Sequence, residues 1–250
     1  MMRAVVLAAV VSSACDVAAS RGPRETVVET RKLDPGGTVS LENANGSVRV
    51  EGWDQDSVRI EAEKRARGGA TLEAIRIEIR GEGDRVDVVT RLPRRWLFGQ
   101  SGWVRYRVMV PVGARLKIET ANGGVEVQGV VGPVQASTVN GSVSILDTSG
   151  RVDASTVNGG IRATFRAVGE ESHSFSTTNG SVAIALPQDV SGEFDARTVN
   201  GSIKTDFPLT VRGDGGGRRL EGRLGEGKAR FEMRTINGSV KIERAPGSRS

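Results

Sequence analysis

Apolar and polar residues alternate along most of this chain, which is the pattern of β-strands with one buried face. The alternation covers positions 39–62, 75–88 and 104–110, and glycine-containing turns separate the segments. After the first 20 residues, no segment sustains the period of an amphipathic helix. The pattern therefore predicts an all-β protein built from many short strands.

A short Asn-Gly motif recurs along the chain and defines an internal repeat. Successive Asn residues from Asn122 to Asn200 are 18, 18, 21 and 21 residues apart, and Asn237 follows after another 37. Positions six and four before the Asn, and three after it, are mostly apolar. The position two before it is Thr in every copy from Thr120 onward. The predicted turn residues are Asn45, Gly46, Asn122, Gly123, Asn140, Gly141, Asn158, Gly159, Asn179, Gly180, Asn200, Gly201, Asn237 and Gly238.

Two architectures fit these repeats. In a β-solenoid, right-handed and β-helix-like, each 18–21-residue repeat is one coil and Asn-Gly is its corner. In an antiparallel hairpin meander, Asn-Gly is a type I′ turn. The solenoid is favoured, because coils stacked about 4.8 Å apart place Asn on Asn and Thr on Thr. We expect positive φ at the corner glycines, and we expect the polar insertion 212–228 to loop out of the stack.

The sequence divides into four parts. Arg3, an apolar stretch and small residues up to Ala19 are typical of a signal peptide over 1–19; alternatively, 1–14 is removed and Cys15 is lipidated. An N-terminal β-strand region, 20–110, is expected to pack on the Asn-Gly repeat solenoid, 111–245, and a polar tail follows over 246–250. The predicted location is the periplasm, the outer membrane as a lipoprotein, or the exterior.

Three stretches together resemble the bacterial putative-adhesin domain family, a group of exported β-strand-repeat proteins of unknown function. They are Leu41 to Val50, Tyr106 to Ala114 leading into the first solenoid repeat, and Leu224 to Gly227 before the last copy. The likeness covers nearly the whole chain after the signal segment. It implies a β-helix-like fold in the cell envelope, and it brings no catalytic residues.

Composition argues against several kinds of chemistry. The net charge of +5 is spread among alternating acids, so no nucleic-acid surface is expected. One His and one Cys are too few for a metal cluster, and no cofactor is predicted. His173 stands six residues before Asn179, at a repeat position that is mostly apolar, so its expected role is that of a histidine packed in the core. An enzyme acting on an envelope or extracellular polysaccharide is the alternative function; it would need two acids in a groove beside arginines.

One stretch departs from the repeat pattern, because it gathers arginines and aromatic residues between 91 and 107. Such residues dominate interface hot spots; the alternative is that they cap the solenoid and form a solvated loop. The sequence therefore indicates a non-catalytic, adhesin-like binding or scaffold module, whose partner is an envelope protein or glycan surface and whose only membrane contact is a lipid anchor. The contact-patch candidates are Arg94, Arg95, Trp96, Trp103, Arg105 and Tyr106.

Overall fold

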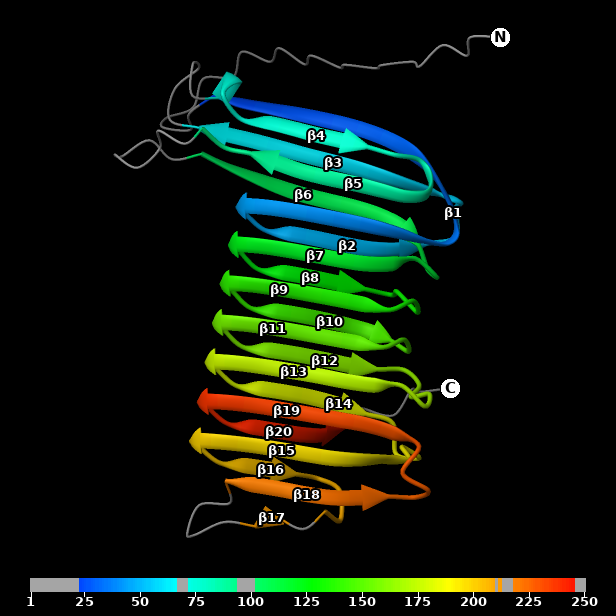
Figure 1. The fold of residues 1–250 in the computed structure, drawn as a ribbon, viewed down its shortest axis with the longest axis vertical. Coiled ribbons are helices and arrows are strands. Elements are labelled where there is room, and N and C mark those ends of the chain that lie inside the picture. Colours follow the sequence, from blue (N-terminus) through cyan, green and yellow to red (C-terminus); the bar gives the residue numbers. More distant parts are fainter. Residues whose placement is uncertain (1–22, 67–71, 94–101, 210, 213–217, 246–250) are drawn as a thin grey trace.

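The computed structural model describes residues 23–66, 72–93, 102–209, 211–212 and 218–245. Over these residues the chain forms 20 strands, which stack as an elongated, two-sided solenoid (Figure 1). The all-β solenoid predicted from the sequence is therefore confirmed. Within the same residues, no helix has the length and apolar character needed to cross a membrane.

One side of the solenoid, sheet B, contains the strand that precedes each Asn-Gly corner. Its strands are parallel, except that β4 pairs antiparallel with β5 at one end, and β18 with β15 and β17 at the other. From end to end its strands are β4 (Arg76–Arg80), β5 (Gly83–Arg91), the second half of β1 (Arg24–Asn45), β7 (Arg115–Asn122), β9 (Val134–Asn140), β11 (Val152–Asn158), β13 (Ser172–Asn179), β19 (Ala229–Asn237), β15 (Gly192–Asn200), β18 (Arg219–Leu224) and β17 (Val211–Arg212).

The other side, sheet A, contains the strand that follows each corner. At its first end, β3 pairs antiparallel with both β1 and β6, and the remaining pairs are parallel. Its strands in order are the first half of β1, β3 (Ser57–Ala66), β6 (Gly102–Pro111), β2 (Val48–Trp53), β8 (Val125–Gln128), β10 (Val143–Thr148), β12 (Ile161–Phe165), β14 (Val182–Leu186), β20 (Val240–Arg244) and β16 (Ile203–Thr205).

Each Asn-Gly corner carries the chain from sheet B to sheet A. Strand β7 pairs with β1 and β9, and the strand that follows its corner, β8, pairs with β2 and β10. The two strands that flank a corner therefore belong to different sheets. The antiparallel hairpin meander, which would pair them with each other, is wrong.

Two strands joined by an Asn-Gly corner form one rung of the solenoid, and the rungs do not stack in chain order. Named by their corner residues, they follow the order Asn45, Asn122, Asn140, Asn158, Asn179, Asn237 and Asn200. The last repeat, β19–β20, thus lies between the two repeats that precede it. The insertion expected to loop out of the stack contributes β18, which extends sheet B beyond β15. Because β15 would otherwise be the last strand of sheet B, its free edge can pair with the alternating residues of the insertion, and this is why the segment does not loop out.

Stacked side chains hold the corners together. The amide Nδ2 of each corner Asn except Asn45 donates a hydrogen bond of 2.7–2.8 Å to Oδ1 of the Asn on the neighbouring rung, in a ladder that runs from Asn200 to the last acceptor, Asn45. Behind this ladder, buried Thr hydroxyls donate to the carbonyl oxygens of corner glycines one rung away. Thr156 Oγ1, for example, lies 2.8 Å from the Gly141 oxygen. The predicted stacking of like residues is therefore present.

The corner glycines are required for a different reason than the one expected. All seven lie within the described residues, and only Gly46 and Gly123 have positive φ, at 116° and 159°. A Cβ added at Gly159 would instead lie under 3.0 Å from the carbonyl oxygen of Gly141, on the next rung. Stacked rungs approach so closely at the corner that only glycine fits. The expectation of positive φ at every corner is wrong, and close backbone approach replaces it.

Candidate binding surface

The structure separates the residues of the sequence-predicted contact patch. Arg94, Arg95 and Trp96 lie outside the described residues, as does Cys15. Tyr106 is fully buried, and its hydroxyl lies 2.7 Å from that of Thr90. Burial raises the pKa of Tyr106 to about 12. Tyr106 is therefore part of the core and is not available to a partner, which corrects its inclusion in the patch.

The remaining two patch residues, Trp103 and Arg105, lie on the outward face of sheet A. The guanidinium carbons of Arg65 and Arg105 both lie 5.1 Å from the centre of the half-buried Trp103 ring. Glu63 pairs with both arginines, at 2.6 Å from Arg65 and 3.6 Å from Arg105. These cations therefore already have an aromatic and an acidic neighbour within the protein.

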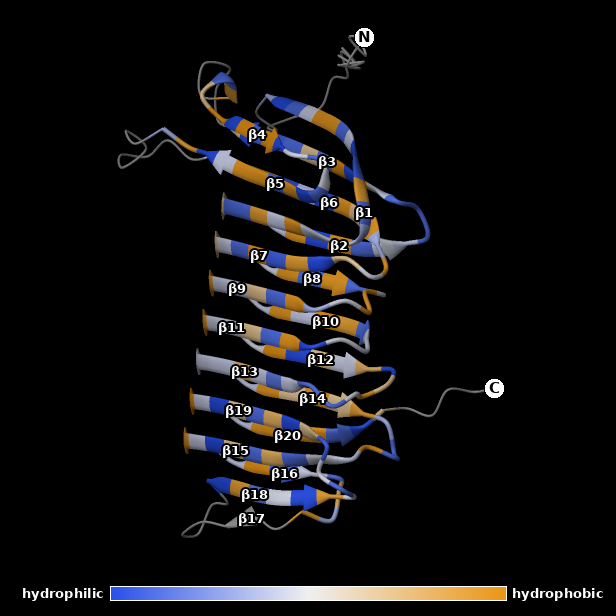
Figure 2. Cartoon of the chain, turned by 45° about the vertical axis from the view of Figure 1, so that its right-hand side comes forward, coloured by the Kyte–Doolittle hydropathy of each residue, from blue (hydrophilic) through white to orange (hydrophobic). Residues whose placement is uncertain are grey.

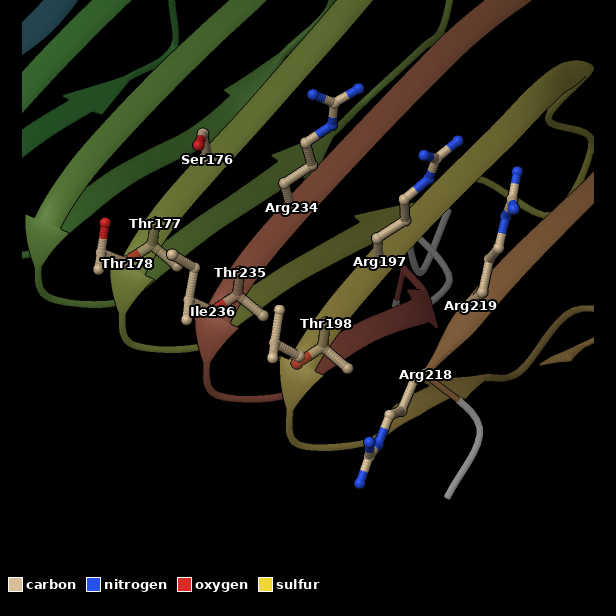
Figure 3. Close-up of a pocket in the computed structure, with 11 residues that line it drawn as sticks. Ser176, Thr177, Thr178, Arg197, Thr198, Arg218, Arg219, Arg234, Thr235 and Ile236 are labelled. Atoms are coloured by element: carbon tan, nitrogen blue, oxygen red, sulfur yellow. The ribbon is translucent and has the colours of Figure 1, made fainter. Parts of the chain in front are cut away.

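A second group of arginines lies at the opposite end of the stack. A depression of about 540 Å³ opens on the outward face of sheet B, between β13, β19, β15 and β18. Arg234, Arg197 and Arg219 stand side by side on neighbouring strands, while Arg218 points the other way (Figure 3). Strand pairing places Arg197 directly opposite both Arg234 and Arg219. Thr178, Val199 and Ile236 complete the margin near the corner.

Among the described residues, no acid lines this depression. The acids that balance the arginines lie next to them along the strands, away from the opening. Asp195 accepts hydrogen bonds of 2.9 and 2.8 Å from Arg197, and Arg234 and Arg219 pair likewise with Glu232 and Glu221. Like charges directly opposite each other on adjacent strands are unfavourable unless neighbouring acids or a bound anion compensate them. The depression thus presents a row of guanidinium groups, which suits carboxylate or phosphate.

An exposed apolar stripe runs from the depression along the corner. The residue before the corner Asn is β-branched and 41–54% exposed at Val139, Val157, Ile236 and Val199. Figure 2 shows the corresponding orange ends of β9, β11, β19 and β15. Because this position points outward, packing inside the solenoid does not require an apolar residue there. Thr178 interrupts the row between Val157 and Ile236, so the stripe consists of two apolar pairs. Exposed apolar groups of this kind are typical of an interaction surface.

Acids also gather beside these arginines, and such a grouping is what a polysaccharide-cleaving enzyme would need. Glu193, Asp195 and Glu221, together with Arg223 and Arg230, line a second depression of about 430 Å³. Arg197 pairs with Asp195 at 2.8 Å and lies 3.8 Å from Glu221. Two of the three carboxylates are therefore engaged in ion pairs on an open sheet surface.

His173 lies in the core, as its repeat position predicted. Its ring stacks on Phe231 at 4.7 Å and meets Phe165 edge-on at 4.9 Å. The backbone N–H of Val152 donates to His173 Nδ1 over 3.2 Å. Burial, with a smaller contribution from Arg151, lowers the pKa of His173 to about 4. Among the described residues, no three or more His, Cys, Asp or Glu side chains are grouped so that they could hold a metal.

Sequence reasoning missed Arg197, Arg219 and Arg234 as a group. Arg197 and Arg234 stand at the same position, three before the corner Asn, so the repeat alignment contained a signal for two of them. Arg219 joins them only because β18 pairs antiparallel with β15. That pairing could not be read from the repeat, since 219 lies in the insertion.

Solved structures of bacterial proteins match this chain at low sequence identity. A putative cell adhesion protein from Clostridium sporogenes matches with a TM-score of 0.50 and 11% identity, covering 88% of this chain and 100% of that one. A putative adhesin from Bacteroides fragilis matches with a TM-score of 0.30 and 10% identity, covering 87% and 97%. At 11% identity, the likeness to the Clostridium sporogenes protein concerns the fold alone.

Among curated proteins, none matches this chain. A family model described as Toastrack DUF4097 matches residues 35–243, which include every Asn-Gly rung of the solenoid. The family resemblance inferred from the sequence is thereby confirmed, and the chain belongs to the Toastrack DUF4097 family.

Proposed function

We propose that this chain is a non-catalytic binding module of the cell envelope, and that it contacts its partner through the outward face of sheet B. The observation that carries the proposal is the depression. Four arginines line it, and among the described residues no acid does. Its ligand would present carboxylate or phosphate groups to Arg234, Arg197 and Arg219, because guanidinium groups bind these anions with charge-assisted hydrogen bonds. The apolar stripe would pack against the same partner beside the corner.

The fold supports a rigid presentation of this surface. Hydrogen-bonded ladders of Asn and Thr fix the spacing of the rungs, so the outward side chains of sheet B are held at regular intervals. A pre-ordered surface loses little conformational entropy when it binds. A scaffold of this kind suits an extended partner, such as an envelope glycan or the surface of an envelope protein.

Co-sedimentation with isolated envelope material tests the proposal. Arg197→Ala combined with Arg234→Ala is expected to reduce binding by at least about tenfold, and added salt should mimic the loss because exposed charges are screened. Arg162→Ala combined with Lys241→Ala removes two exposed cations from sheet A and serves as the matched control. Equal binding by both double variants, with unchanged melting temperatures, would contradict a role for the arginine face.

The proposal includes export. The signal segment 1–19, or a lipid anchor at Cys15, would bring the module to the periplasm, the outer membrane or the exterior. Cell fractionation of wild type and Cys15→Ala distinguishes these routes, since only the lipoprotein loses its membrane association in the variant. Recovery of the wild-type protein in the cytoplasm would contradict export by either route.

A second contact surface is proposed at the other end of the stack. It comprises Trp103 and Arg105, together with Arg94, Arg95 and Trp96, which precede them in the sequence and lie outside the described residues. Arg65 and Arg105 share Glu63 there, whereas each arginine of the row in the depression has an acid beside it, so ion pairing leaves both surfaces with arginines that a ligand could bind. Arg105→Ala in the same co-sedimentation assay measures the contribution of this second surface.

Hydrolysis of a polysaccharide is the alternative function, and the second depression is the place for it. Glu193, Asp195 and Glu221 lie there beside arginines, as such a site would need. Sugar release that disappears in Asp195→Asn combined with Glu221→Gln would establish the enzyme and contradict the non-catalytic proposal.

A further inference from the structure

Side chains on the outward face of sheet B change charge along the stack. At the position three before the corner Asn, acids occupy the first two rungs, serines the middle three, and arginines the last two rungs and β18. The strand pairings align these residues directly across neighbouring strands. From the first rung to the last strand, the column contains Glu42, Glu119, Ser137, Ser155, Ser176, Arg234, Arg197 and Arg219.

Two rungs carry opposite charges at three successive outward positions. On the Asn122 rung the signs are positive, positive and negative, and on the Asn200 rung they are negative, negative and positive. All six side chains are exposed or half-buried on the same face. In strand order, β7 presents Arg115, Lys117 and Glu119, and β15 presents Glu193, Asp195 and Arg197.

The positions of these two rungs matter as much as their charges. From β1 to β18 sheet B has eight strands, and the Asn122 and Asn200 rungs stand second from each end of this run. The sheet continues beyond it through β5 and β4 at one end and through β17 at the other. A two-fold axis along the strand direction, between the Asn158 and Asn179 rungs, therefore exchanges the Asn122 and Asn200 rungs. It also brings Glu42 opposite Arg219, and Val139 opposite Ile236 of the other copy.

We infer that the partner of this face is a second copy of the chain, docked face to face with its stack antiparallel. This inference rests on the proposed function, because it names the partner of the same surface. In the pair, Glu119 meets Arg197 of the second copy and Lys117 meets its Asp195, twice by symmetry. Val139 and Ile236 of the apolar stripes meet across the pair, and in each depression Arg197 and Arg219 receive carboxylates from Glu119 and Glu42 of the other copy.

The opposite orientation is disfavoured by the same charges. If the two stacks ran parallel, the arginine end of one copy would face the arginine end of the other, and the acidic ends would also meet. Like-charge juxtaposition across an interface suppresses wrong pairings. The charge pattern therefore selects the antiparallel arrangement as well as the partner.

The face is large enough to hold two copies together. Eight strands at about 4.8 Å and six residues per strand at about 3.3 Å cover roughly 38 Å by 20 Å. That is about 750 Å² per copy, close to the roughly 800 Å² per partner of a standard specific interface. The intramolecular pairs Lys117–Glu119 at 3.0 Å and Arg197–Asp195 at 2.8 Å remain in place and join into four-charge clusters.

Sedimentation equilibrium of the full chain tests the inference through charge reversal. Wild type is expected to dimerise, whereas Arg197→Glu and Glu119→Arg, each alone, should raise the dimer dissociation constant more than about tenfold through like-charge repulsion. An equimolar mixture of the two variants should recover dimers. In the mixed dimer the two substituted positions face each other with opposite charges, and the unmodified pair is retained. Arg162→Glu, an exposed change on sheet A, is the matched control and should dimerise like wild type.

Several outcomes would overturn the inference. These are a wild-type chain that stays monomeric, reversals that leave the dimer intact, or a mixture that fails to recover it. If a charge reversal lowers the melting temperature, Arg197→Gln and Glu119→Gln are used in its place. Dimers as stable as wild type in both of these variants would contradict the inference. A monomeric wild type that still co-sediments with envelope material through Arg197 and Arg234 refutes self-pairing and leaves the proposed function standing.

Discussion

The corner of each rung and the outward face of sheet B come from the same strands but follow different rules. At the corner, Asn and Gly repeat on every rung, because the hydrogen-bonded ladder and the close backbone approach allow little else. Three residues earlier on the same strands, the side chain changes from Glu119 to Ser155 to Arg197. Packing does not constrain that outward position. Repetition therefore marks what stacking requires, and variation marks where a partner can be recognised.

The largest expected effect lies at the corner. Gly159→Ala should destabilise the fold by about 3 kcal/mol or more, because the new Cβ meets the Gly141 carbonyl on the next rung, and neither backbone can move without breaking the ladder. Gly113→Ala is the matched control, since a Cβ there meets nothing within 4 Å. Urea denaturation measures both. Similar midpoints for the two variants would break the distinction between corner and loop glycines.

The next effect lies inside the rung, at His173. Its pKa falls from the usual 6.5 to about 4 in the folded state, so the unfolded chain binds more protons between these values. Stability should therefore decline as pH falls from about 6.5 to 4, by a total on the order of 3 kcal/mol. His173→Phe keeps the stacking on Phe231 but should lack this component. Identical pH profiles for the two proteins in urea denaturation would contradict a buried neutral histidine.

A smaller effect separates two threonines of the same column. Thr156→Val removes the hydrogen bond to the Gly141 oxygen and should cost about 1–2 kcal/mol. Thr120 is equally buried, but its hydroxyl has no hydrogen-bond partner among the described residues. Thr120→Val should therefore be neutral or stabilising. Equal losses in both variants would show that side-chain packing, and not the hydrogen bond, accounts for the repeated threonine.

The sequence predicted the repeated side of the molecule well, because stacking leaves its mark at fixed spacing. Asn140 and Thr138 could be assigned to ladders from the repeat spacing alone. The φ angle of Gly141 could not, since the glycine is needed for an approach between rungs that no local pattern reveals. The position of β19 between β13 and β15 could not be predicted either, because every rung presents the same strand edge to its neighbour.

The proposed binding face was harder to predict, and the reason is again physical. Interleaved arginine and tryptophan near Trp103 form a local signal that stands out within one segment. Tyr106, in the same stretch, instead fills the core. Arg197, Arg219 and Arg234 come from separate strands, and only strand pairing brings them into one row. A surface assembled across strands leaves little trace in any single segment.

Arginine-specific covalent labelling of the folded protein, followed by mass spectrometry, tests most directly which face recognises the partner. At protein concentrations where the chain is monomeric, the reactivity of each arginine is compared between free protein and protein saturated with envelope material. We expect that Arg197, Arg219 and Arg234 lose reactivity on binding, while Arg162 on sheet A keeps it. Protection of Arg65, Arg105 or Arg162 with no change at Arg197 would contradict the assignment of the binding face to sheet B.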